Sequence, residues 1–296
     1  MTHELWIFLI ASLMATSCAL VGSLMVLRRM AMIGDALSHT VLLGLVLAFM
    51  LTGERSLTVM FVGATVVGLV TVFLTDLLNR MGKLQKDACI GIVFTFLFAL
   101  AIILISAYTG EIDIDQEHLL YGEIAFAPFD TFEWQGQDVG PRAFWSLLFV
   151  TVANLLFIVI GYRHLQTVAF NASLATALGM SVNLIHYALT TMVSLTTVAS
   201  FEAVGAILVV AMLVIPANTA YLFCRSIQGM LIWSVIFAIA ASISGYYLAV
   251  WADASISAAI AMMSGFIFIL ILITVGPESV IQKIKFRFGL NRMNLS

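Results

Sequence analysis

The residues with the clearest chemical potential are Asp35 and His39, an acid and an imidazole placed four positions apart. In a helix, this spacing brings the two side chains onto one face, one turn apart. The surrounding segment is otherwise apolar, and a charged side chain at the centre of a bilayer costs about 3 kcal/mol or more unless a partner or water compensates it. A pair of this kind indicates a cation pathway.

A carboxylate oxygen and an imidazole nitrogen together suit manganese, iron or zinc better than calcium or magnesium. Two ligands are too few to hold such an ion. A second copy of the chain, or a homologous partner related by a pseudo-two-fold axis, would supply two more, so Asp35 and His39 predict a metal site shared between two subunits. The same residues leave one alternative open, a buried Asp–His pair that only locks helix packing.

The composition shows which elements must position this pair. Hydrophobic residues make up 62% of the chain and charged residues 10%, and the mean hydropathy of +1.10 lies outside the range of soluble domains. We therefore expect an all-α, polytopic integral membrane protein with 8–9 transmembrane helices. The segment 5–27 is long for a signal-peptide core and follows Glu4 rather than a basic cluster, which favours a retained first helix.

Apolar runs separated by short polar breaks define the candidate spans. The runs are 5–27, 32–51, 57–78, 88–108, 144–162, 187–200, 203–222, 229–250 and 257–275. The stretch 187–222 is interrupted mainly by Glu202, so it could be two passes, or one pass with a re-entrant piece.

The distribution of basic residues predicts the orientation. With the amino terminus outside, 11 of the 13 lysines and arginines lie on the cytoplasmic side, and only Arg55 and Arg142 lie outside. An odd number of passes is needed to place the basic carboxyl-terminal tail inside. This count favours two passes in 187–222.

Two connecting segments are long, and long loops in compact membrane proteins are usually functional. The outer segment 109–143 contains eight acids, and it is either a plain solvated loop or a region that attracts cations and docks a delivering protein. The acids are Glu111, Asp113, Asp115, Glu117, Glu123, Asp130, Glu133 and Asp138. The inner segment 163–186 contains a short helix-forming run, 174–180, in which Gly179 can cap the helix. His164 and His186 flank this inner segment, and we interpret both as interfacial side chains.

Several short motifs together resemble the permease subunits of ATP-driven importers that take up manganese, zinc or iron. The motifs are RRMAMIGDALSH (28–39), DACIGI (87–92), DID (113–115), LYGEI (120–124), AVG (203–205) and IPA (215–217). The outer-segment motifs are most like those of manganese-type members. Glu202 departs from the pattern, which has a neutral polar residue there, so an extra ligand or a packing role stays open for it.

The resemblance implies that residues 1–296 form one ABC transporter permease domain in a bacterial cytoplasmic membrane. It implies a cytoplasmic ATPase, a second like or homologous permease and a metal-binding delivering protein as partners, and no nucleic acid. The segment 163–186 would carry the helix that couples the permease to the ATPase, and an ordinary surface turn is the alternative. The coupling residues would be Leu174, Ala175, Ala177, Leu178 and Gly179.

The chain has no phosphate-cradling loop of its own, because Gly82-Lys83 lacks the upstream glycine and the following Ser or Thr. We therefore expect a transport subunit that is not an enzyme and has no cofactor beyond the transported ion. One rival is an ion-coupled secondary transporter or channel. The other, an intramembrane metalloenzyme, is disfavoured because the chain lacks a His-Glu-x-x-His pattern.

Overall fold

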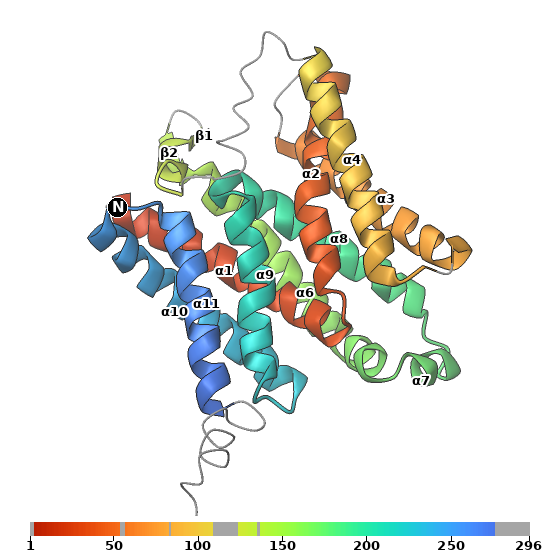
Figure 1. The fold of residues 1–296 in the computed structure, drawn as a ribbon. Coiled ribbons are helices and arrows are strands. Elements are labelled where there is room, and N and C mark those ends of the chain that lie inside the picture. The colour runs from red at the N-terminus through yellow and green to blue at the C-terminus, as the bar shows by residue number, and fades with distance from the viewer. Residues whose placement is uncertain (1–2, 54–56, 83, 109–123, 135–136, 276–296) are drawn as a thin grey trace, which may run out of the picture.

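The computed structural model describes residues 3–53, 57–82, 84–108, 124–134 and 137–275, and these ranges form ten α-helices, one short 3-10 helix and a small β-hairpin (Figure 1). The prediction of an all-α, polytopic membrane protein is confirmed. The α-helices are α1 (His3–Leu27), α2 (Ala31–Thr52), α3 (Leu57–Gly82), α4 (Lys86–Tyr108), α6 (Arg142–Phe170), α7 (Ala172–Ala177), α8 (Val182–Val204), α9 (Ala206–Tyr221), α10 (Ile227–Ala252) and α11 (Ile256–Val275).

Helix α1 forms the centre of the bundle. It is apolar around its whole circumference, a pattern typical of a helix that is buried on all sides. Ile10 and Met14 are fully buried, and α1 packs against α6, α9 and α10. At Gly22 a side chain would collide with the backbone of Leu213 on α9, so the glycine allows the two helices to touch.

Polar side chains inside the bundle join helices through hydrogen bonds. The Asn154 amide on α6 donates to Ser17 Oγ of α1 and to Thr196 Oγ1 of α8, each at 2.8 Å. Ser23 on α1 and Ser234 on α10 form another such bond, also 2.8 Å long. These hydrogen bonds join helices in an interior that offers no water as a partner. The Asn154 Oδ1 atom has no hydrogen-bond partner among the described residues.

The ambiguous stretch 187–222 folds as two antiparallel helices. Helix α8 ends at Val204, Gly205 adopts a positive φ of 80°, and α9 begins at the next residue. His186 near the start of α8 and Ala220 near the end of α9 both lie close to the end of α1. Eight helices are long and apolar enough to cross a membrane within the described ranges, and α9 is a shorter apolar helix of 16 residues. The stretch 187–222 is therefore divided between two helices, of which α8 is one of the eight candidate spans and α9 is a shorter apolar helix.

The two ends of the bundle differ, and we name them the hairpin side and the α7 side (Figure 1). The 3-10 helix η1 (Ala127–Phe129) and strands β1 (Thr131–Trp134) and β2 (Gln137–Pro141) lie next to the start of α1. The His3 and Phe129 rings are 4.4 Å apart there. The sequence did not predict this hairpin, which lies within the outer segment 109–143, and residues 109–123 of that segment lie outside the described ranges.

The inner segment 163–186 is largely helical, because α6 continues to Phe170 and α8 already begins at Val182. Only α7 and two short connections remain between them. Six described basic residues cluster at or near the α7 side, whereas Arg142 lies on the hairpin side, paired with Asp130 at 3.5 Å. The six are Arg28, Arg29, Arg80, Lys86, Arg163 and Arg225.

Candidate metal site and coupling helix

Asp35 and His39 lie in the first turns of α2, on the face that the sequence predicts. Their Oδ1 and Nε2 atoms are 3.7 Å apart. Helix α1 ends just before them with Arg29 in the left-handed region at φ 55°, so the chain turns sharply and α2 starts at Ala31. We call Asp35 and His39 the α2 pair.

The α2 pair is accessible. The Asp35 side chain is 40% exposed and the His39 side chain 32% exposed. The His39 ring lies between two phenylalanines of α4, stacked on Phe94 at 5.7 Å and edge-on to Phe98 at 5.6 Å. The ring is therefore held by aromatic contacts while part of its surface stays free.

The α2 pair is an incomplete metal site within one chain. No group of three or more histidines, cysteines, aspartates or glutamates that could hold an ion occurs in the part of the chain that the structure describes. Two protein ligands fall short of the number that manganese or zinc takes in proteins. Among the described residues, no third carboxylate, thiol or imidazole joins Asp35 and His39.

A second Asp–His contact lies on the α7 side, and the sequence did not indicate it. Asp76 of α3 and His186 of α8 approach to 3.2 Å between Oδ2 and Nε2, without the alignment of a hydrogen bond. Their side chains are 24% and 11% exposed. We call this contact the α3–α8 pair, in which the His186 side chain is largely buried.

Helix α7 confirms the predicted short helix and its capping glycine. The Asn171 side chain caps its start by accepting from the Leu174 N–H at 2.9 Å. At its end Gly179 has φ 78°, and the Met180 N–H donates to the Ala175 carbonyl at 2.9 Å, the pattern of a Schellman motif. The helix spans Ala172–Ala177, so it begins two residues before the predicted run.

The predicted coupling residues divide into two groups in the structure. Leu174 and Leu178 are 50% and 61% exposed, and Ala177 and Gly179 are exposed beside them. Ala175 is fully buried, so it anchors α7 to the protein instead of facing a partner. The exposed leucines, one turn apart, form a small apolar surface on α7.

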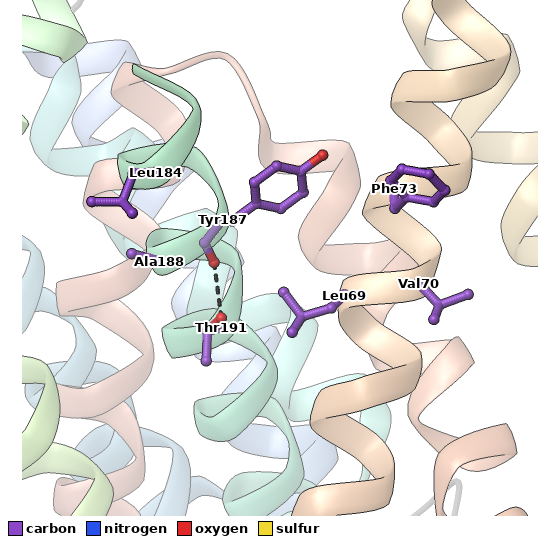
Figure 2. Close-up of a pocket in the computed structure, with 7 residues that line it drawn as sticks. All are labelled: Leu69, Val70, Phe73, Leu184, Tyr187, Ala188 and Thr191. Carbon is purple, nitrogen blue, oxygen red and sulfur yellow. Dashed lines mark hydrogen bonds between the residues drawn. The ribbon is translucent and has the colours of Figure 1, made fainter. Parts of the chain in front are cut away.

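A groove between α3 and α8 is lined mainly by apolar side chains (Figure 2). Its lining contains no carboxylate and no imidazole, and the Thr191 hydroxyl donates to the Tyr187 carbonyl at 2.9 Å. The lining residues are Leu69, Val70, Phe73, Leu184, Tyr187, Ala188 and Thr191. The groove is therefore distinct from the α2 pair.

Comparison with known families agrees with this arrangement of helices and side chains. The family model described as the ABC 3 transport family matches residues 3–275. The chain belongs to this family. Its members are transport subunits of ABC transporters, which accounts for a chain with many membrane spans and no nucleotide-binding motif.

Individual relatives carry names that concern metals. The chain is 48% identical over 265 residues to the manganese transport system membrane protein MntD of Bacillus subtilis, covering 90% of each protein. It is 38% identical to the zinc transport system membrane protein TroD of Treponema pallidum, covering 96% of this chain and 76% of TroD. The solved structure of PsaBC from Streptococcus pneumoniae in complex with Fab aligns with a TM-score of 0.79 at 30% identity, over 96% of each chain.

Proposed function

We propose that this chain is the membrane permease of an ATP-driven importer of a divalent transition-metal ion, with manganese favoured over zinc and iron. The observation that carries the proposal is the accessible α2 pair inside an apolar helix of an ABC 3 family chain. The names of MntD and TroD support manganese or zinc as the cargo.

In this proposal Asp35 and His39 bind the ion on its way through the membrane. A second copy of the chain, or a homologous permease, contributes an equivalent pair, and four ligands then surround the ion. ATP binding to a separate ATPase switches the shared cavity between outward-facing and inward-facing states. The chain's own contribution is to bind, orient and release the ion.

The basic residues support an orientation with the α7 side in the cytoplasm. Six described lysines and arginines gather there against Arg142 on the hairpin side, as the positive-inside rule expects. The amino terminus is then outside and α11 ends inside. The protein would lie in the cytoplasmic membrane of a bacterium.

The same orientation assigns a partner to each side. Leu174, Ala177 and Leu178 of α7 face the cytoplasm, where an apolar surface suits a groove on the ATPase. The acidic outer segment faces a metal-delivering protein. Such a segment attracts cations and steers a partner by long-range electrostatics.

The proposal is tested by reconstituting the permease with its ATPase and metal-binding protein in liposomes. We expect uptake of radioactive manganese that requires ATP and is lost in Asp35→Ala and His39→Ala, although both variants still assemble. Near wild-type uptake by either variant at limiting metal would contradict the site. Uptake without the ATPase, driven by an ion gradient, would favour the rival secondary transporter.

A further inference from the structure

The α3–α8 pair is the most buried of the carboxylate–base contacts described here. Its side chains are 24% and 11% exposed, compared with 40% and 32% for the α2 pair and 65% and 55% for Asp130 and Arg142. In a low-dielectric environment each partner depends on the other for its charge or polarity to be compensated. The contact therefore links α3 to α8.

Two basic residues lie near the pair. Arg28 after α1 and Lys86 at the start of α4 are close enough to act electrostatically on His186. Burial lowers the pKa of the Arg28 guanidinium, whose Nη1 atom has no hydrogen-bond partner among the described residues. Asp76, Arg28 and Lys86 thus surround one largely buried imidazole, that of His186.

On one side the pair connects to α7 through a short, well-ordered link. The Schellman motif at Gly179 ends α7, and Ser181 caps the start of α8 by accepting from the Leu184 N–H at 3.4 Å. Four residues, 178–181, separate the two helices, and His186 lies in the second turn of α8. Because this connection is short, a displacement of α7 should also displace the first turns of α8, where His186 lies.

On the other side the pair connects to the α2 pair through α3. Helices α2 and α3 touch at Gly44, where an added Cβ would lie 2.5 Å from the Ala64 Cα atom. Farther along, Thr71 of α3 donates a hydrogen bond to Thr40 of α2 at 3.1 Å. Thr40 directly follows His39, so α3 contacts the helix turn that carries the α2 pair.

We propose that Asp76 and His186 are positioning residues that transmit the movement of α7 through α3 to the metal-bearing turn of α2. The inference rests on the proposed function, because it assigns to these residues the coupling of the same metal site. Neither side chain touches the ion in this scheme. Energetic coupling can be carried by chains of packed side chains and polar contacts, and the α3–α8 pair supplies one such contact between helices far apart in the chain.

The test uses the assembled importer in liposomes and compares Asp76→Asn and His186→Gln with wild type. We expect both variants to assemble, to bind Mn²⁺ within about twofold of wild type without nucleotide, and to hydrolyse ATP. The amount of metal moved per ATP should fall by at least about fivefold, the lower end of typical coupling effects. Asp87→Asn is the matched control, because it removes an exposed carboxylate from the same side, and it should keep the wild-type ratio.

Wild-type transport per ATP in both variants would overturn the inference, as would a parallel loss of Mn²⁺ binding. Either result leaves the proposed function intact if Asp35→Ala still abolishes uptake. The exchange variant Asp76→His/His186→Asp restores the contact with the partners reversed, and it should recover most of the transport ratio. If the single variants fail to assemble, the exchange variant tests the inference in their place. An exchange variant that assembles but still moves little metal per ATP would contradict the role of the α3–α8 pair in coupling.

Discussion

The two Asp–His pairs contain the same chemical groups in different settings. Asp35 and His39 lie one turn apart on a single helix and keep roughly a third of their surface free. Asp76 and His186 come from different helices and are mostly buried against each other. The comparison teaches that residue type alone does not distinguish an accessible Asp–His pair from a buried one in this protein.

The physical difference lies in where the polar atoms can find partners. An accessible carboxylate and imidazole retain lone pairs that an incoming ion can use. A buried pair needs its atoms for mutual compensation, because an unpaired polar group in a low-dielectric interior is costly. The α2 pair can therefore bind a transported ion, and the α3–α8 pair can transmit movement between helices.

The largest expected difference is in metal binding after the same substitution at the two histidines. His39→Gln should abolish Mn²⁺ binding and uptake, because an amide is a poor ligand for these ions. His186→Gln should retain Mn²⁺ binding, because in the proposed scheme its imidazole does not touch the ion. Isothermal titration of both purified variants with Mn²⁺ measures this contrast, and equal loss of binding in the two would break the comparison.

A charged residue on the exposed face of α7 should have the next largest effect. Ala177→Glu would bury an unpaired acid at an apolar contact and separate the permease from its ATPase. Thr176→Glu is the control, because Thr176 is exposed on a different face of the same helix. Co-purification of the ATPase measures the outcome. Full retention of the ATPase by Ala177→Glu would show that α7 does not dock it.

The two aspartates should differ in their effect on stability. Asp76→Asn weakens a buried contact and should lower the free energy of unfolding by about 1–3 kcal/mol. Asp35→Asn changes an accessible side chain and should alter it by no more than about 0.5 kcal/mol. Thermal unfolding of the metal-free permease in detergent compares them. Equal destabilisation would mean that both pairs are structural.

Single changes in the outer segment should have the smallest effects. Charges on a wet loop are screened within about 8–10 Å at physiological salt, so Asp113→Asn should reduce uptake only slightly. Combined neutralisation of Asp113, Asp115 and Glu117 should slow uptake chiefly at low metal or low delivering-protein concentration. Uptake measured against concentration separates the cases. A maximal rate as low as that of Asp35→Ala would place an obligatory ligand in this segment.

The sequence by itself determined the features that depend on local spacing and composition. Asp35 and His39 share a face because four positions make one helical turn, and Gly179 ends α7 because it accepts a positive φ. The apolar runs predicted the membrane helices, since about 20 apolar residues span a bilayer. The combination of motifs predicted the family that the comparisons then showed.

Only the tertiary structure decided which distant residues meet and which side chains are buried. Asp76 and His186 carry no shared spacing signal, and they approach because α3 packs against α8. Ala175 looks like its neighbours in the sequence, yet it is buried while Leu174 and Leu178 are exposed. The physical reason is that hydrophobicity in a membrane protein does not say whether a side chain faces lipid or another helix, so burial follows from helix packing alone.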